Sequence, residues 1–178
     1  MVRTIALVGH SGSGKTTLLR TLCGLTRAHA GEIRWHGNSI HKLGDDYHAQ
    51  LAYVGHANGI QGDLTPVENL RVASSLSGDA DKSRIGTTLE RLGLAAYHHF
   101  PSKILSQGQK RRLALARLLV EHKPLWILDE PLSGLDVDSV SLMTTILMEH
   151  LAHGGSIVIT SHQEIDVETK TTLHIRIN

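Results

Sequence analysis

One segment near the N-terminus constrains the fold of this 178-residue chain more than any other feature. Residues 9–16 read GHSGSGKT, which fits the pattern G-x-x-x-x-G-K-[ST], and a β-branched and aliphatic run, Thr4–Val8, precedes them. Glycines let such a loop turn its backbone N–H groups inward towards phosphate groups, and a following helix adds unpaired amides and its positive end. The segment therefore predicts a strand, a phosphate-binding loop and a helix, the opening unit of an α/β fold.

Two side chains of this loop have defined chemistry. Lys15 places a positive charge where the β- and γ-phosphates of a nucleoside triphosphate lie, and the hydroxyl of Thr16 can ligate Mg²⁺. The candidate nucleotide-binding residues are Gly9, His10, Ser11, Gly12, Ser13, Gly14, Lys15, Thr16 and Thr17.

Short apolar runs alternate with helical patterns along the rest of the chain, which predicts a mainly parallel sheet flanked by helices. The more polar stretch 58–105 is expected to form a helical insert, and a Thr-x-x-Glu capping box from Thr65 to Glu68 opens its first helix. We expect a single domain, with 1–57 and 106–178 as the core and 58–105 as a helical subdomain. The further predicted strands are Glu32–Trp35, Leu51–Val54, Leu125–Leu128, Ser156–Thr160 and the alternating run around Leu173, Ile175 and Ile177; the predicted helices include 16–23, 107–121 and one with Val140, Met143, Leu147 and Leu151 on one face.

Composition excludes several classes of protein. The chain has 18 Lys and Arg against 17 Asp and Glu, which argues against a strongly basic nucleic-acid binder. No run approaches the ~20 apolar residues that span a bilayer, and the single cysteine, Cys23, cannot form an internal disulfide. The chain has 13 histidines, and pairs such as His98/His99 and His150/His153 lack carboxylates or cysteines at metal-site spacing. Apart from His162, which is a separate case, we expect the histidines on solvated surface. Together these features predict a soluble cytosolic protein.

A second group of candidate residues follows the apolar run Leu125–Leu128. Asp129 and Glu130 would lie at the carboxyl edge of the sheet, where α/β proteins bind their ligands. Asp129 would then hold Mg²⁺ directly or through water, and Glu130 could act as general base on a water in line with the γ-phosphate.

A third group lies at the predicted start of the helix 107–121. Ser106 and the amide of Gly108 would make a second anion site at a helix N-terminus. Two such sites cannot meet on one nucleotide within one compact domain, so each is expected to serve a nucleotide held by a different molecule. The candidate residues that bind in trans are Ser106, Gly108 and Gln109.

These segments resemble the motifs of ATP-binding-cassette (ABC) ATPases. Leu105–Gln109 resembles their LSGGQ signature, with Gln107 in place of the first glycine; Ser133–Asp136 resembles their D-loop, and Thr160–His162 the strand end that carries their switch histidine. The resemblance covers essentially the whole chain. It implies a P-loop NTPase fold with a helical subdomain and a reduced N-terminal antiparallel sheet. It also implies a head-to-tail homodimer that encloses two ATP molecules with Mg²⁺, with His162 at the γ-phosphate and Asp136 at the subunit interface.

A narrower resemblance concerns the runs 53–60 and 64–70, together with Leu125–Pro131. These are similar to the haem-exporter branch of the family, which serves cytochrome c maturation. The resemblance implies a peripheral subunit on the cytoplasmic face of a bacterial inner membrane, with membrane-embedded transporter subunits docked near residues 56–75 and no nucleic-acid partner.

Besides Gln107, two features depart from the family's pattern. His56 stands where most members have a glutamine that ligates Mg²⁺, and an imidazole is a poorer partner for that hard cation than an oxygen, so His56 is a sensor candidate rather than a metal ligand. Only eight residues precede Gly9, and none is the aromatic residue that stacks on adenine in the family. We therefore expect the natural polypeptide to begin further upstream.

Three other functions are alternatives to a transporter ATPase. A soluble ABC-type ATPase acting on ribosomes or nucleic acid is disfavoured by the near-neutral charge. A GTPase would need an Asn/Thr-Lys-x-Asp guanine-binding motif, which the sequence lacks, and a small-molecule kinase has no use for Ser106–Gln109. A degenerate cassette that only binds ATP stays open because of the changes at Gln107 and His56.

Overall fold

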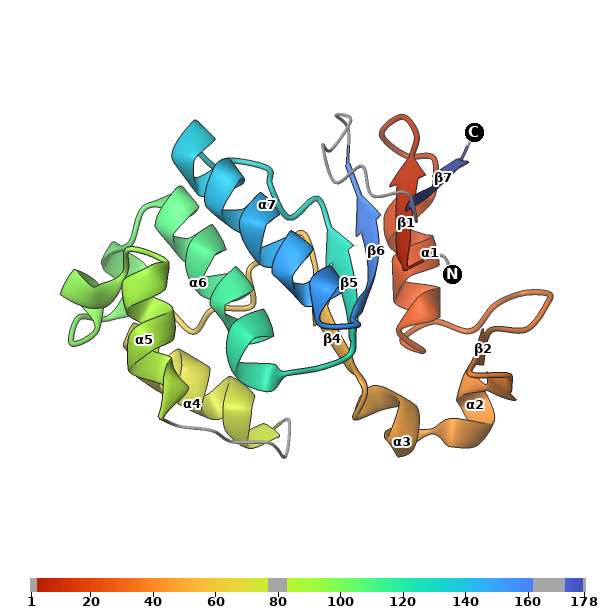
Figure 1. Ribbon diagram of the computed structural model, residues 1–178, viewed down its shortest axis with the longest axis horizontal. Helices are drawn as coiled ribbons and strands as arrows, with labels where there is room; N and C mark the ends of the chain where they lie inside the picture. Colours follow the sequence, from red (N-terminus) through yellow and green to blue (C-terminus); the bar gives the residue numbers. More distant parts are fainter. Residues whose placement is uncertain (1–2, 77–82, 162–171, 178) are drawn as a thin grey trace. The chain divides into compact units, whose positions relative to one another are not determined.

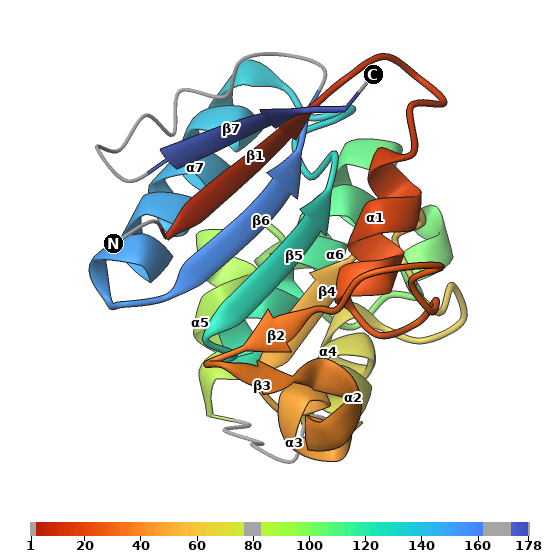
Figure 2. The same cartoon turned by 90° about the vertical axis from the view of Figure 1, so that its right-hand side faces the viewer.

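The computed structural model describes residues 3–76, 83–161 and 172–177 of the chain. Their central feature is a five-stranded sheet with the order β4-β5-β6-β1-β7 (Figure 2). All pairings between neighbouring strands are parallel, as the alternation of strand and helix patterns predicts. The strands are β1 (Thr4–Val8), β4 (Leu51–Val54), β5 (Leu125–Asp129), β6 (Ser156–Thr160) and β7 (Thr172–Arg176).

The chain divides into two compact units. The first contains the whole sheet and comprises the described residues of Met1–Gly55, Lys123–Glu130 and Leu147–Asn178; the second comprises His56–His122 and Pro131–Ile146. The second unit takes in more than the stretch 58–105, because the helix after the signature segment packs with the helices of that stretch. The subdivision at residues 57 and 105 stays a prediction.

Helix α1 (Lys15–Leu22) covers one face of the sheet and begins directly after the glycine-rich loop. Gly24 ends it in the left-handed conformation, with φ +74°. The Gly24 N–H donates to the Thr21 carbonyl at 3.0 Å and the Leu25 N–H to the Arg20 carbonyl at 2.9 Å, which together make a Schellman motif. The predicted helix and its glycine stop are therefore confirmed.

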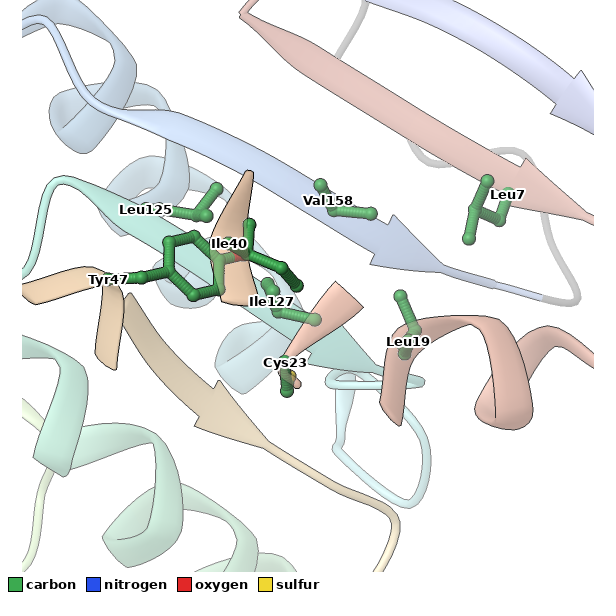
Figure 3. Close-up of a cluster of buried hydrophobic side chains, with 8 residues drawn as sticks. All are labelled: Leu7, Leu19, Cys23, Ile40, Tyr47, Leu125, Ile127 and Val158. Carbon is green, nitrogen blue, oxygen red and sulfur yellow. The ribbon is translucent and has the colours of Figure 1, made fainter. Parts of the chain in front are cut away.

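Aliphatic side chains fill the space between α1 and the sheet. Leu19 of α1 packs with Leu7 of β1 and Ile127 of β5 in a cluster that excludes water (Figure 3). Cys23 belongs to the same cluster, and its burial raises the pKa of the thiol to about 12. This apolar packing holds in place the carboxyl ends of β1 and β5, next to the glycine-rich loop.

The antiparallel sheet of the first unit has two short strands, β2 (Arg34–Trp35) and β3 (Asn38–Ser39). His36 and Gly37 both take positive φ and form the two-residue hairpin turn between the strands. Strand β2 begins later than the predicted strand Glu32–Trp35, because its partner β3 ends at Ser39, where a helix begins at Ile40. The short helices α2 (Ile40–Leu43) and α3 (Asp45–His48) follow.

The opposite face of β5 carries Trp126, whose ring stacks on that of His150 with 3.7 Å between centroids. His150 lies in the last turns of α7 (Val137–Ala152), and the ring nitrogen Nε2 is buried. The expectation that the histidines lie on solvated surface is therefore wrong for His150. Burial lowers its pKa, and the neighbouring His153 adds to this effect.

The second unit is built from helices, and α4, α5 and α6 lie side by side in it (Figure 1). The predicted capping box opens α4: the Glu68 N–H donates to Thr65 Oγ1 at 3.2 Å, and the Thr65 N–H donates to Glu68 Oε2 at 2.8 Å. The elements of this unit besides the start of α7 are α4 (Pro66–Leu76), α5 (Arg84–Arg91), η1 (Ala95–Tyr97), η2 (Ser102–Ile104) and α6 (Gln107–Glu121).

The last strand, β7, lies at the edge of the sheet beside β1. Its predicted alternation of apolar and polar residues is present, but the apolar residues Leu173 and Ile175 are 44% and 39% exposed. The apolar side chains of this edge strand are therefore only partly buried. Among the helices of the described ranges, none is long and apolar enough to cross a bilayer.

Candidate functional site

The glycine-rich loop joins β1 to α1 and closes around its own lysine. Lys15 is 5% exposed, and its ammonium group donates to the carbonyl oxygens of Gly9 at 2.7 Å and His10 at 2.8 Å. Gly12 and Gly14 have φ of +83° and +95°, a region that side-chain-bearing residues rarely adopt. The predicted loop therefore has the backbone curl that its glycines imply.

The loop offers hydrogen-bond donors to an anionic group. The hydroxyl of Ser13 is buried and has no hydrogen-bond partner within the described chain. A Cβ on Gly9 would approach that hydroxyl to 2.6 Å and the Ile177 carbonyl oxygen to 2.4 Å, so only glycine fits there. An ammonium, an unpartnered hydroxyl and the amides at the start of α1 suit the phosphate groups of a nucleotide.

Asp129, at the end of β5, is held by two threonines from elsewhere in the first unit. Thr16 Oγ1 donates to Asp129 Oδ2 at 2.8 Å, and Thr160 Oγ1 donates to Asp129 Oδ1 at 2.8 Å. Thr160 in turn accepts the Glu130 N–H at 2.9 Å. One hydroxyl thus orients both acidic residues, and this role of Thr160 was missed by the sequence analysis, where only its place at the strand end was noted.

The donor set at Asp129 fits a magnesium ion. Mg²⁺ prefers hard oxygen ligands and keeps several waters, and a carboxylate beside a threonine hydroxyl supplies two such oxygens. Asp129 is 2% exposed, and the hydrogen bond from Thr160 fixes its second oxygen. Among the described residues, no group of three or more His, Cys, Asp or Glu side chains is placed to hold a metal.

Glu130 has an unusual backbone conformation. Its φ of +49° puts it in the left-handed region, which costs a non-glycine residue about 1–3 kcal/mol. The hydrogen bond from its N–H to Thr160 helps to hold the turn in which the chain leaves β5. Strain of this kind is typical of functional positions, so the conformation supports the assignment of Glu130 as a reacting residue.

The candidate residues of the signature segment, Leu105–Gln109, lie in the second unit. Ser106 N-caps α6: the Gln109 N–H donates to Ser106 Oγ at 3.2 Å, and Gln109 Oε1 accepts the Ser106 N–H at 2.8 Å. A Cβ on Gly108 would lie 3.5 Å from the Gly134 carbonyl, so the start of α6 runs beside the D-loop-like segment 133–136. The predicted helix start is confirmed, with a complete capping box.

Asp136 caps the next helix. The Ser139 N–H donates to Asp136 Oδ1 at 2.8 Å, at the start of α7. Hydrogen bonds from the Ser139 side chain and backbone lower the pKa of Asp136, and the charge of Arg112 adds to the effect. Asp136 is therefore anionic at neutral pH.

The candidate residues fall into the two units as follows. Gly9–Thr17, Asp129 and Glu130 meet within the first unit, at the carboxyl ends of β1 and β5. Ser106, Gly108 and Gln109 belong to the second unit, as does the exposed His56. His162 lies outside the described residues.

Comparisons with known proteins agree with these motifs. The family described as "ABC transporter" matches residues 2–133. The cytochrome c biogenesis ATP-binding export protein CcmA of Nitrosospira multiformis is 51% identical over 160 residues, 89% of this chain and 78% of that protein. The CcmA of Nitrosomonas europaea is 50% identical over 168 residues, 94% of this chain and 79% of that protein.

The fold comparison gives the same result. A solved structure titled as the ATP binding subunit of an ABC transporter superposes with a TM-score of 0.82 at 26% identity, covering 90% of this chain and 68% of that chain. The predicted fold class, an ABC-type P-loop fold, is confirmed. The chain belongs to the ABC transporter family, as one of its CcmA-type ATPases that bind ATP.

Proposed function

We propose that this chain is the ATP-hydrolysing subunit of a CcmA-type exporter in cytochrome c biogenesis. The observation that carries the proposal is the network in which Thr16, Asp129 and Thr160 meet and to which the Glu130 N–H also bonds. It joins the phosphate loop to the two acidic residues that hydrolysis requires. The names of the CcmA relatives support the cellular process.

ATP is bound first through its phosphates. In the described conformation the Lys15 ammonium bonds two loop carbonyls, and on binding it exchanges them for the β- and γ-phosphate oxygens. Backbone amides of Gly12–Thr17 at the start of α1 donate to the same phosphates. Thr16 and Asp129 would hold Mg²⁺, which when bound neutralises negative charge on the phosphate oxygens.

Hydrolysis then needs one proton acceptor. The oxygen of a water attacks the γ-phosphorus in line, the bond from that phosphorus to the bridging oxygen breaks, and ADP leaves with the bond's electron pair. Glu130 takes the proton of the attacking water as general base, and His162 contacts the γ-phosphate. Preorganised positive charge from Lys15 stabilises the transition state.

The site is completed by a second copy of the chain. Ser106, Gly108 and Gln109 of one subunit are proposed to face the phosphate loop of the other, so that two ATP molecules lie in a head-to-tail homodimer. The start of α6 supports this role because its unpaired amides can bind an anion. Asp136 would line the same interface.

ATP hydrolysis is proposed to drive a conformational change in membrane-embedded partner subunits. Membrane-embedded subunits are proposed to dock near residues 56–75, which would place the ATPase at the cytoplasmic face of a bacterial inner membrane as a peripheral subunit. Support comes from the word "export" in the names of the relatives. His56 is a sensor candidate in this segment.

Hydrolysis by the purified protein tests the proposal. With MgATP, the Lys15→Ala variant should lose activity about 100-fold, since it lacks a charge aimed at the transition state. Lys103→Ala is the matched control, because it removes only an exposed ion pair with Asp63 at 3.0 Å. ATP bound without hydrolysis by the wild type would instead indicate a binding-only cassette. Co-purification with membrane proteins rather than ribosomes tests the partner.

A further inference from the structure

Arg111 is a buried cation on the first turns of α6. It is 5% exposed, although Ser106 and Gln107 just before it are exposed. Its Nε donates to the Pro131 carbonyl oxygen at 3.0 Å, and its Nη1 donates to Asn58 Oδ1 at 3.2 Å. All of these residues belong to the second unit.

The partners of Arg111 are the residues next to other motifs. Pro131 directly follows Glu130, and Asn58 lies two residues after His56. Arg111 itself lies two residues after Gln109, the end of the signature segment. One guanidinium therefore joins three segments that are separated by 53 and 20 residues along the chain.

Burial makes these bonds costly to lose. A buried charge without its hydrogen bonds pays a large desolvation cost, and a carbonyl or amide oxygen that loses its donor is also penalised. The planar guanidinium directs several donors at fixed angles, which a lysine ammonium cannot do. The Arg111 side chain thus fixes the direction of the Pro131 carbonyl and of the Asn58 amide.

The same end of α6 lies beside the chain that follows Pro131. Gly108 is close enough to Gly134 that an added Cβ would be in van der Waals contact with its carbonyl oxygen, at 3.5 Å. The segment 131–136 is therefore fastened to α6 at its beginning by Arg111 and packed on it near its end. Displacement of the start of α6 must move this segment.

We propose that Arg111 is a positioning residue that holds the segments after Glu130 and after His56 in register with the signature segment. The inference rests on the proposed function, in which Ser106 binds the partner's nucleotide. Such binding would then shift the backbone next to Glu130 and near His56. Arg111 does not touch the nucleotide in this account. It acts through Pro131 and Asn58.

Arg112 provides a matched control on the same helix. Its Nη1 donates to the Leu92 carbonyl oxygen at 3.0 Å, which ties α6 to the end of α5 within the helical bundle. Loss of Arg112 removes a cation and a bond to a backbone carbonyl, as loss of Arg111 does. It leaves the bonds to Pro131 and Asn58 in place.

Amide hydrogen exchange on the full-length protein without nucleotide tests the positioning role. In Arg111→Ala, peptides covering 57–64 and 131–139 should exchange about tenfold faster, because the bond that orders them is gone. Arg112→Ala should leave the 57–64 peptides unchanged and should affect 131–139 less than Arg111→Ala does, since Arg112 acts on Asp136 through its charge and bonds Leu92 rather than Pro131. Arg111→Lys, which retains the charge, should give an intermediate increase and serves if the alanine variant does not fold.

Steady-state kinetics provide the second readout. Arg111→Ala should lower kcat about tenfold or more with KM for ATP changed less than twofold, since the phosphate loop is untouched. Asn58→Leu should lower kcat in the same way, whereas Asn58→Asp should retain it, because a charged acceptor strengthens the bond to Arg111.

Several results would overturn the role of Arg111. One is an equal increase in amide exchange in the Arg111 and Arg112 variants. Another is faster exchange in Arg111→Ala that is confined to peptides other than 57–64 and 131–139. The third is a kcat that stays at the wild-type value in Arg111→Ala. A wild-type protein that does not hydrolyse ATP would refute the proposed function instead. In that case the exchange measurement would still test whether Arg111 orders the segments around Asn58 and Pro131.

Discussion

Thr16 and Asp129 are 113 residues apart in the chain, and the hydroxyl of the first donates a 2.8 Å hydrogen bond to the carboxylate of the second. The bond links the phosphate loop to the end of β5 without a ligand. It brings together the two oxygen donors that the sequence analysis assigned independently to Mg²⁺.

Thr16→Val should separate the hydroxyl's role from that of side-chain shape. The variant keeps the volume but loses the bond to Asp129, so MgATP hydrolysis should fall about tenfold to a hundredfold. Thr21→Val on the same helix is the control, because the Thr21 hydroxyl, among the described residues, bonds the Thr17 carbonyl alone. Equal activity of the two variants would contradict the role of Thr16.

Ser106 caps α6 and is proposed to contact the partner's nucleotide, and substitutions can separate these two roles. Its Oγ accepts the Gln109 N–H, which leaves the hydroxyl proton free to donate to a phosphate. Ser106→Ala should cost about 1 kcal/mol of stability through the lost cap. Ser106→Asp should keep the cap and the melting temperature, yet prevent ATP-dependent dimerisation, since a carboxylate repels phosphate. Dimer formation by the Asp variant would argue against the contact in trans.

Local patterns made much of the fold predictable. The glycine-rich loop, the cap at Thr65 and the stop at Gly24 each depend on residues a few positions apart, so the sequence carries the whole signal. The buried strand Leu125–Leu128 is predictable for a related reason, because a fully apolar run needs no partner to be recognised.

Contacts between distant segments were not predictable. Thr160 reaches Asp129 only because β5 and β6 pair in register, and Arg111 reaches Asn58 across 53 residues. The stacking of His150 on Trp126 likewise depends on where α7 meets the sheet. The positive φ of Glu130 has no signal in its residue type, since glycine is the usual choice there.

His150 should make stability depend on pH. Burial holds its folded-state pKa below the usual 6.5, so the unfolded chain binds the proton first as pH falls. The contribution of neutral, buried His150 to the free energy of unfolding is fully present above about pH 6.5, and it is lost as the pH falls below that value. Melting temperatures from pH 8 to 5 should therefore decline less steeply for His150→Leu than for wild type. The exposed His29→Gln, which does not contact His150, should match wild type. A wild-type slope in His150→Leu would contradict the role of His150.

Cys23 should report unfolding. It is 2% exposed, and burial raises its pKa to about 12, so thiolate is scarce and shielded at pH 8. A thiol-specific reagent should label the native protein about 100-fold or more slowly than the denatured chain. Because Cys23 is the single cysteine, all labelling of the chain by the thiol reagent reports on this residue. Rapid labelling of the native protein would show that the cluster around Leu19 opens readily.

In the proposed mechanism, two chains enclose ATP and Glu130 of each chain removes a proton from the attacking water. Sedimentation of the Glu130→Gln variant with and without MgATP tests it most directly, with hydrolysis measured in parallel. We expect an ATP-dependent dimer that persists, and a turnover lowered by about 100-fold or more, because glutamine binds water but cannot accept its proton. A variant that hydrolyses ATP at the wild-type rate, or that stays monomeric with ATP bound, would contradict the account.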